Sequence, residues 1–303
     1  MATSTDRLRT SSTHDTVFLH YDQAALDAAY DQTHWAPNRT AAWERRADMA
    51  EIARQVLGAP QRHAYGPTAV EQLDLFRAPT TGAPILVFLH GGAWRRGTAL
   101  DHAFPAEVFV AAGAHYVVPD FAWVQDVGGN LATLVDQIRQ AIVWVYRNAE
   151  SFGGDPERIY LGGHSSGAHL GAAALLTDWR GHGIPADVVK AALCVSGLYD
   201  LRGARLSARN SYVNFTDEIE NALSVQRHIS AVPCPVTVAY GTFDSPEFQR
   251  MGKEFADALE REGKLAKLIV ARGYNHFELL ETIGNPYGLI GRAALEMMKL
   301  SPA

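Results

Sequence analysis

The sequence predicts an α/β fold whose mostly parallel central sheet is flanked by helices. Short apolar runs that end at glycine or polar residues recur along the chain, and such runs are typical of strands buried on both faces. Helix-like segments with one apolar stripe lie between them, and strands that alternate with helices form parallel sheets covered on both sides. A chain of 303 residues, 47% of them hydrophobic, can bury the core that such a fold needs.

The expected strands begin at residue 72. Residues 72–76 (QLDLF) alternate as a half-buried strand should, whereas residues 84–90 (PILVFLH) form a continuous apolar run. Five further apolar runs complete the expected sheet: 115–121, 158–163, 189–197, 235–241 and 266–273.

The segments between these strands have the period of an α-helix. Within residues 130–149, apolar side chains recur three or four positions apart, at Leu131, Leu134, Ile138, Ile142 and Val145. Another helix is expected to start at Ser245 as the N-cap, with Pro246 in its first position. Its apolar face would hold Phe248, Met251, Phe255 and Leu259.

Three segments lie outside this alternation. Residues 1–15 are expected to form a flexible tail, and residues 16–303 a single α/β domain. Residues 22–57 have helix-forming composition and predict an N-terminal helical arm or part of a cap. Residues 198–232 are the least periodic stretch between two strands, and they predict a cap-like insertion.

Composition excludes several classes of function. The formal net charge is −6, and no cluster of Lys and Arg marks a nucleic-acid surface. The polar N-terminus and the lack of a long apolar run predict a soluble cytoplasmic protein that does not enter a membrane. Cys194 and Cys234 are too few for a disulfide framework or a thiolate zinc site, so we expect both to be buried.

Residues 163–167 (GHSSG) match the pattern G-x-S-x-G between a buried strand and a helix-like segment. This pattern places a nucleophilic serine on a sharp turn, where a side chain at either glycine would collide with it. In this register Ser165 is the nucleophile. Ser166 follows it, and its backbone N–H at the helix start can stabilise an oxyanion.

A second glycine-rich turn, residues 90–94 (HGGAW), ends the strand at 84–90. Acyl transfer needs N–H groups aimed at the oxyanion, and glycine-rich backbone can approach a substrate closely. The candidate donors are Gly91, Gly92 and Ala93, of which Gly92 and Ala93 are preferred. We expect His90 to hold this turn through hydrogen bonds rather than to act as a base.

A serine nucleophile needs a base and an acid further along the chain, in the order Ser, Asp or Glu, His. His276 follows the last expected strand and is preferred as the base over His228, which lies in the insertion. Asp244 follows the strand at 235–241, at the end where catalytic side chains of parallel sheets collect. Two alternatives for the acid remain, Asp200 and Glu247.

Four aromatic residues stand at expected strand ends or beside a catalytic candidate. Together they predict a pocket for a flat apolar group, lined by Trp94, Phe121, Trp123 and Phe277. His164 and His169 lie five apart across the turn without a third ligand at zinc-site spacing, so we expect no metal site. The chemistry expected of a serine nucleophile needs no cofactor.

With these residues in place, the chain resembles the bacterial kynurenine formamidase (arylformamidase) branch of the α/β-hydrolases, close to the hormone-sensitive-lipase-like esterases. The resemblance covers roughly residues 21–299. HGGAW and GHSSGAHL are specific to the superfamily, whereas SGLYDL, DSPEF and HFELL in that order are more specific to the branch.

The resemblance implies a triad of Ser165, Asp244 and His276, and hydrolysis of an N-formyl aryl amide or an activated aryl ester. Three departures from the family pattern flank the pocket. Ser166 stands where the family usually has Ala or Gly, Ala93 stands where it often has Tyr, and PDFAWVQD replaces a frequent tyrosine and proline after the next strand.

Two classes of function therefore compete. The first is a serine hydrolase that acts on a small aromatic amide or ester, either as an arylformamidase-like amidase or as a broad carboxylesterase for aryl or alkyl esters, carbamates or lactones. The second is a non-catalytic α/β-hydrolase scaffold that acts as a ligand receptor, although the intact set of catalytic candidates argues against it. The sequence is compatible with a homodimer and does not fix the oligomeric state.

Overall fold

The computed structural model describes residues 15–303, so the tail expected over residues 1–15 falls, except for its last residue, outside the described residues. A single eight-stranded sheet runs through the molecule, with the strand order β1-β2-β4-β3-β5-β6-β7-β8. The strands are β1 (Gln61–Ala64), β2 (Gln72–Phe76), β3 (Ala83–Leu89), β4 (His115–Pro119), β5 (Gly154–His164), β6 (Val189–Val195), β7 (Val236–Gly241) and β8 (Leu265–Ala271).

Strands β1 and β2 pair in antiparallel fashion, and β2 is also antiparallel to β4. All the other neighbouring strands are parallel. This confirms the mostly parallel sheet expected from the sequence. Strand β1 was not expected, because its residues QRHA are mostly exposed and carry no apolar signal.

The continuous apolar runs reflect burial on both faces of the sheet. In β3, Ile85, Val87 and Leu89 belong to one core, while Leu86 and Phe88 belong to a second core on the opposite face. Successive side chains of a strand point to opposite faces, so a strand between two cores must be apolar at every position.

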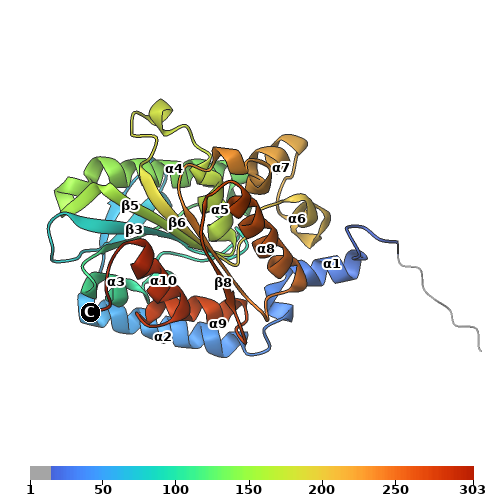
Figure 1. Ribbon diagram of the computed structural model, residues 1–303, viewed down its shortest axis with the longest axis horizontal. Coiled ribbons are helices and arrows are strands. Elements are labelled where there is room, and N and C mark those ends of the chain that lie inside the picture. The colour runs from blue at the N-terminus through green and yellow to red at the C-terminus, as the bar shows by residue number, and fades with distance from the viewer. Residues whose placement is uncertain (1–14) are drawn as a thin grey trace, which may run out of the picture.

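Helices cover both faces of this sheet (Figure 1). The first core is closed by α4 (Leu131–Asn148), α5 (Ser166–Leu175) and α8 (Pro246–Arg261). The second is closed by α2 (Arg39–Leu57), α3 (Ala106–Ala111), α9 (His276–Glu281) and α10 (Leu289–Met297). Helix α8 begins as expected, with the Ser245 side chain accepting from the N–H of Phe248 and Pro246 in the first turn.

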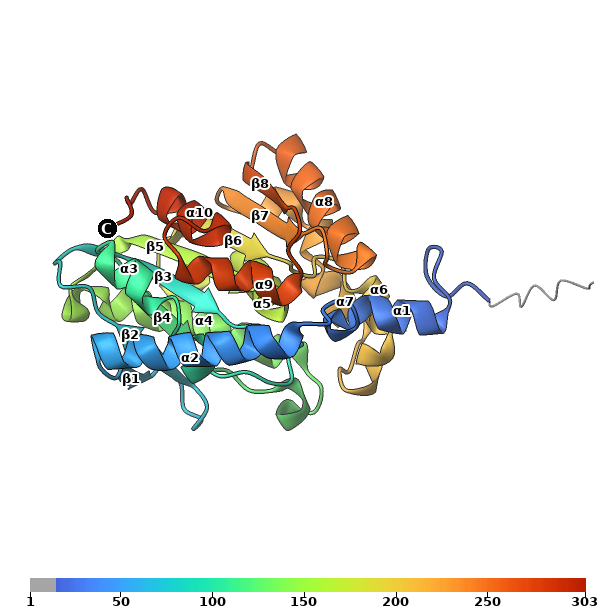
Figure 2. The same ribbon diagram turned by 90° about the horizontal axis from the view of Figure 1, so that it is seen from below.

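The N-terminal segment forms two helices that lie apart. Helix α2 runs along the second face beside α3 and α9, whereas α1 (Gln23–Tyr30) lies beside α6 and α8 (Figure 2). Two hydrogen bonds between side chains attach the segment to α8: Gln32 Nε2 donates to Ser245 Oγ at 2.8 Å, and the Tyr30 hydroxyl donates to Glu247 at 3.2 Å. The arm is therefore attached to the loop and helix that follow β7.

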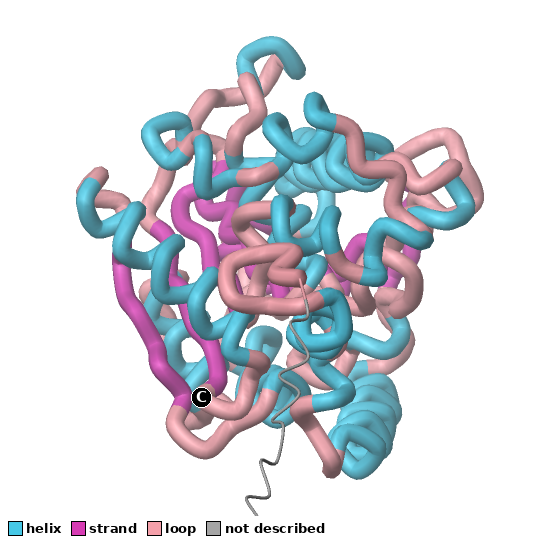
Figure 3. Tube along the Cα trace, turned by 90° about the vertical axis from the view of Figure 1, so that its right-hand side faces the viewer, coloured by secondary structure: helices cyan, strands magenta, loops and turns pink. Residues whose placement is uncertain are grey.

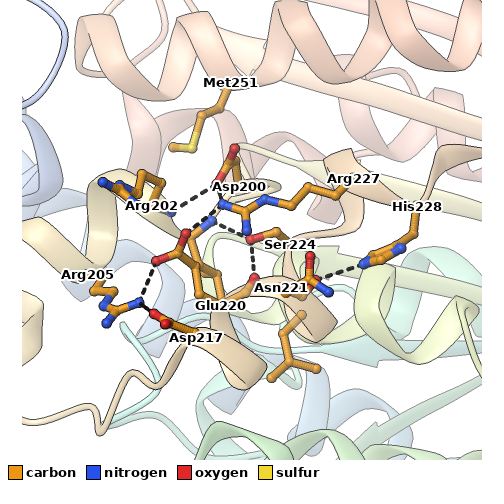
Figure 4. Close-up of polar contacts among 12 residues, drawn as sticks. Asp200, Arg202, Arg205, Asp217, Glu220, Asn221, Ser224, Arg227, His228 and Met251 are labelled. Carbon is orange, nitrogen blue, oxygen red and sulfur yellow. Dashed lines mark hydrogen bonds and ion pairs between the residues drawn. The ribbon is translucent and has the colours of Figure 1, made fainter.

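Residues 198–232 hold α6 (Arg202–Leu206) and α7 (Asp217–Leu223), joined by loops and short 3-10 turns. Buried Glu220 links them, because its carboxylate pairs with Arg205 at 3.0 Å and with Arg227 at 2.7 Å (Figure 4). The end of the molecule that carries α1 and α6 faces the viewer in Figure 3, and helices and loops lie in front of most of the sheet there.

The structure bears on two further expectations, one about the cysteines and one about membrane-spanning helices. Cys194 and Cys234 are both free and buried. Within residues 15–303, none of the helices combines the length and apolar character needed to cross a membrane.

Candidate active site

Ser165 stands on the sharp turn between β5 and α5. Its backbone has φ 56° and ψ −124°, a conformation that non-glycine residues seldom adopt. The Ser165 N–H donates to the carbonyl oxygen of Val195 at 2.8 Å, which fixes the turn to the end of β6. Such strain persists only where the surroundings over-determine the backbone, and it concentrates at functional sites.

The two glycines of the turn are required by close backbone contacts. A Cβ atom at Gly163 would lie 2.7 Å from the carbonyl oxygen of Gly167, and one at Gly167 would lie 2.1 Å from the carbonyl oxygen of Leu89. Any side chain at either position would therefore displace main chain. The start of α5 is pressed against the end of β3, which brings Ser165 next to the turn after that strand.

That turn has three successive residues with positive φ: Gly92 at 127°, Ala93 at 55° and Trp94 at 63°. The N–H groups of Gly92 and Ala93 donate to no residue in the described chain. Gly91 contacts Ser165, since a Cβ atom there would lie 3.1 Å from Ser165 Cβ. Successive free N–H groups on such a turn form a concavity that binds anions.

Ser166 is the first residue of α5 and is 1% exposed. The first N–H groups of a helix have no acceptor within the helix, so that of Ser166 is free for another partner. The residue before it, Ser165, contacts Gly91 of the turn after β3.

The His90 side chain contacts the turn after β3. Its Nδ1 lies 2.9 Å from the carbonyl oxygen of Gly91, and its ring stacks on Phe121 with the ring centroids 4.2 Å apart. Burial lowers the pKa of His90, which keeps the imidazole neutral and makes Nδ1–H the donor to that carbonyl. His90 therefore positions the turn.

His276 is the first residue of α9, and a capping box built on Asn275 and Glu278 fixes the start of this helix. Its Nδ1 lies 3.5 Å from Oδ1 of Asp244, and both side chains are almost fully buried. Neither of these two atoms has a hydrogen-bond partner elsewhere in residues 15–303. Each is therefore available to the other.

Asp244 is oriented by its second oxygen. Oδ2 accepts from Ser196 Oγ at 2.6 Å and from the N–H of Gly241 at 3.1 Å. Ser196 follows β6 and has φ 47°, so it is a further non-glycine residue with positive φ at the carboxyl end of the sheet. Sequence analysis missed Ser196, although a serine directly after a buried strand and before a glycine was the available signal.

The two histidines that flank the serines form hydrogen bonds that join segments around the site. His164 Nε2 lies 2.9 Å from the carbonyl oxygen of His276, so it ties the nucleophile turn to the start of α9. His169 Nδ1 accepts from Trp94 Nε1–H at 3.2 Å, and its Nε2 lies 3.1 Å from the carbonyl oxygen of Leu223. Burial lowers the pKa of both imidazoles, to about 4 in His169.

The alternative acid and base residues are engaged elsewhere. Asp200 accepts from Arg227 at 3.0 Å, and His228 Nε2 lies 2.8 Å from the carbonyl oxygen of Asn221 (Figure 4). Glu247 forms an ion pair with Arg250 and accepts from Tyr30. None of these three lies on the wall of the cavity that holds Ser165 and His276.

This cavity has a volume of about 750 Å³. Its wall combines the nucleophile turn, the turn after β3 and the start of α9 with residues from the N-terminal arm and the insertion. Wall residues that sequence analysis did not single out include Tyr30, Gln32, Trp43, Arg46, Arg95, Arg96, Ser207, Arg209 and Tyr212. The arm therefore covers the site, which periodicity alone does not reveal.

The expected aromatic pocket needs correction. Phe277 lines the cavity, but Trp94, Phe121 and Trp123 do not. Trp94 and Phe121 are only 1% and 3% exposed, because Trp94 packs against His169 and Phe121 stacks on His90 in the interior. Trp123 points outward at 38% exposed, with its Nε1–H donating to the carbonyl oxygen of Gly97 at 3.0 Å.

The remaining aromatic wall comes from the arm. Trp43 packs edge-to-face against Phe277, with the ring centroids 5.3 Å apart. No group of three or more histidine, cysteine, aspartate or glutamate side chains within the described range could hold a metal ion. A serine beside free N–H groups, followed in the chain by a carboxylate and then an imidazole, is an arrangement suited to acyl transfer.

Known proteins are similar to this chain in sequence and in fold. A family model described as BD-FAE matches residues 73–183. A kynurenine formamidase from Danio rerio is 29% identical over 286 residues, covering 90% of this chain and 95% of the relative. A kynurenine formamidase from Salmo salar is 30% identical over 255 residues, covering 82% of this chain and 83% of the relative. The crystal structure of esterase LipW from Mycobacterium marinum superposes with a TM-score of 0.67, 20% identity and 89% coverage of both chains.

Proposed function

We propose that this chain, which belongs to the kynurenine formamidase family of the α/β-hydrolases, cleaves an aryl amide or ester through an acyl-enzyme on Ser165. The relatives are hydrolases, and the family resemblance read from the sequence is confirmed. The observation that carries the proposal is the approach of Asp244 to His276 at 3.5 Å, with His276 and Ser165 on the wall of one cavity.

In the proposed mechanism, His276 removes the hydroxyl proton of Ser165 as its oxygen attacks the substrate carbonyl. Asp244 holds the imidazole in the required tautomer and stabilises its positive charge. The N–H groups of Gly91, Gly92, Ala93 and Ser166 are the candidate donors to the tetrahedral oxyanion. His276 then protonates the leaving amine or alcohol, and a water molecule activated by the same imidazole releases the acid.

The substrate that fits the family best is an N-formyl aryl amide, for which the acyl-enzyme is a formyl ester. The aromatic leaving group would lie against Phe277 and Trp43. A broader carboxylesterase is the second candidate, because a cavity of about 750 Å³ has room for acyl groups much larger than formyl.

The experiment compares Ser165→Ala with Ser166→Ala on formanilide and on short-chain p-nitrophenyl esters. We expect Ser165→Ala to lower kcat by about 10⁴-fold or more, because it removes the nucleophile. Ser166→Ala keeps the backbone N–H and should stay within about tenfold of the wild type, since one hydroxyl hydrogen bond contributes little. Substantial turnover by Ser165→Ala would overturn the assignment.

Two further measurements use the same purified protein. Labelling of Ser165 by a sulfonyl fluoride would exclude a silent receptor, and failure to label would favour it. The ratio of kcat/KM on formanilide to that on the esters separates the two substrate classes, because a strongly ester-biased ratio would remove the formamidase assignment and leave the mechanism intact.

A further inference from the structure

We propose that the N-terminal arm positions the catalytic pair, Asp244 and His276. Gln32 has the main part, because it fixes Ser245 and thereby the main chain of Asp244. The inference rests on the proposed hydrolytic function, since it concerns the acid and the base of the same site. Gln32 begins the short 3-10 turn Gln32–His34 that follows α1. It acts on the pair only through the residues next to it in the chain, so it is a positioning residue.

The side-chain amide of Gln32 binds both the hydroxyl and the backbone N–H of Ser245. Its Nε2 donates to Ser245 Oγ at 2.8 Å, and its Oε1 accepts from the Ser245 N–H at 3.0 Å. The Ser245 hydroxyl donates in turn to the carbonyl oxygen of Ala29 at 2.6 Å. Gln32 and Ser245 are both buried, and hydrogen bonds away from water are stronger than those at the surface. The arm therefore fixes Ser245 in one place.

Ser245 passes this constraint directly to Asp244, which precedes it in the chain. Ser245 is also the N-cap of α8, so the arm fixes the point at which this helix begins. The Asp244 carboxylate is held by Ser196 and Gly241, whereas its main chain is continuous with the residue that the arm fixes. Oδ1 of Asp244 lies 3.5 Å from Nδ1 of His276, which is longer than a formed hydrogen bond. The pair therefore tolerates little further displacement of the Asp244 main chain.

The same arm also contacts the residues that fix His276. Oδ1 of Asn38 accepts from Asn275 Nδ2 at 2.7 Å, and Nδ2 of Asn38 donates to Glu278 Oε1. Asn275 and Glu278 form the capping box with which α9 begins at His276. One segment of the arm, residues 32–38, therefore contacts both the residue after the acid and the residue before the base.

Attachment of the arm to the rest of the fold does not by itself require the Gln32 amide. Arg45 of α2 binds the Glu281 carboxylate through two nitrogens, at 2.9 and 2.7 Å, and Gln23 donates to the carbonyl oxygen of Leu206 at 3.0 Å. A buried amide costs free energy unless it is hydrogen-bonded, and an apolar side chain could hold the arm by packing without that cost. A buried polar contact with its hydrogen bonds made specifies a single arrangement, which is what a catalytic pair needs.

The test is a double-mutant cycle between Gln32→Met and Asp244→Asn, with kcat and KM measured on formanilide and on a p-nitrophenyl ester. Gln32→Met keeps a side chain of similar length but removes both hydrogen bonds to Ser245. We expect it to lower kcat by about ten- to a hundredfold and to leave KM within about threefold, because a misplaced acid impairs the chemical step more than binding. In the Asp244→Asn background it should change kcat less than about twofold, because no carboxylate is left to position.

Two outcomes of the cycle would overturn the inference and leave the proposed function standing. One is an unchanged kcat in Gln32→Met. The other is the same fold-loss of kcat in both backgrounds, because a purely structural role of Gln32 does not depend on the Asp244 carboxylate. If Asp244→Asn alone left kcat unchanged, the proposed acid would be wrong and the inference would fall with it, so this single variant distinguishes the two failures.

Two further variants complete the experiment. Arg45→Gln is the matched control, because it removes an attachment of the arm that involves neither Ser245 nor Asn275, and kcat should stay within about twofold. Asn38 is exposed, so Asn38→Ala should fold even if circular dichroism shows that Gln32→Met does not. It should lower kcat by about three- to tenfold, and less than about twofold in the Asp244→Asn background. If Asn38→Ala lowered kcat no more than Arg45→Gln, the arm would not position the pair.

Discussion

Nδ1 of His276 and Oδ1 of Asp244 lie 3.5 Å apart at the carboxyl end of the sheet, and neither atom has another hydrogen-bond partner in the described chain. The separation is longer than a formed hydrogen bond, and catalytic hydrogen bonds commonly tighten only when the substrate binds. The other carboxylate oxygen is already held by Ser196 and Gly241. Oδ1 of Asp244 is thus left free to accept from His276, as the proposed mechanism requires.

Asp244→Asn should lower kcat by about 10³- to 10⁴-fold with little change in KM, because an amide cannot stabilise the imidazolium and favours the wrong tautomer. Steady-state kinetics on formanilide and a p-nitrophenyl ester measure the effect. The control is Asp200→Asn, which changes a carboxylate that accepts from Arg227 and from the N–H of Arg202 within the insertion, and it should change kcat less than about threefold. A large loss of kcat in Asp200→Asn and a small one in Asp244→Asn would assign the acid to Asp200.

The nucleophile turn gives a second prediction, which concerns packing. Gly167→Ala should reduce the free energy of unfolding by about 3 kcal/mol or more, because the new Cβ would lie 2.1 Å from the carbonyl oxygen of Leu89 and cannot be accommodated without moving main chain. Urea unfolding measures this loss. Esterase activity should fall with it, since the displaced turn carries Ser165.

Gly171→Ala, one turn further along α5, is the matched control. There the new Cβ meets only side-chain methyl groups, at 3.3 Å for Leu89 and 3.4 Å for Leu161, which can shift. The gain in helix propensity partly offsets this crowding, so the change in stability should stay within about 1 kcal/mol. If Gly167→Ala and Gly171→Ala lost the same free energy of unfolding, the contact at Gly167 would not constrain the turn.

Trp43→Ala should raise KM for aryl formamides by about five- to tenfold, because it removes the aromatic wall that the arm places against Phe277. The effect on kcat should be smaller, since Trp43 contacts neither of the catalytic side chains. Trp123→Ala removes a tryptophan that lies outside the cavity, so it should leave KM within about twofold. If Trp123→Ala raised KM and Trp43→Ala did not, Trp43 would not contact the bound substrate. The arm would then have to move away when substrate binds.

The sheet was predictable because its parallel strands are buried on both faces and so carry uninterrupted apolar runs. The exceptions lie at the antiparallel end and at the edge. Strand β1 is short and exposed, and carries no pattern. Edge strand β8 exposes Leu268 and Val270, so its apolar run alone does not report burial. Chain order singled out the candidate nucleophile, acid and base, which follow β5, β7 and β8 respectively.

The cavity wall could not be predicted in the same way. Periodicity identified helices in residues 22–57 but does not say which surface they cover, and the contact of Gln32 with Ser245 joins segments 213 residues apart. Trp94 was expected to line the pocket because it stands just after a strand. Its positive φ instead turns the ring into the core.

His169 predicts how stability depends on pH. Its imidazole joins α5 to Trp94 and to the end of α7, and it must be neutral at Nδ1 to accept from the Trp94 N–H. Burial lowers its pKa to about 4 in the folded protein, against about 6.5 for an unfolded chain. Between these values only the unfolded state binds the proton, so the free energy of unfolding falls as the pH drops from 6.5 to 4. The linkage relation gives a loss of about 2 kcal/mol between pH 8 and pH 5.

His169→Gln isolates this contribution. Glutamine can still accept from Trp94 and donate to the carbonyl of Leu223, but it does not titrate. The variant should be less stable than the wild type at pH 8, and the gap should narrow by about 2 kcal/mol at pH 5, as measured by urea unfolding at both pH values. The other buried histidines titrate in both proteins and cancel in the comparison. If the difference in unfolding free energy between His169→Gln and the wild type were the same at pH 8 and pH 5, the fold would not be keeping this imidazole neutral.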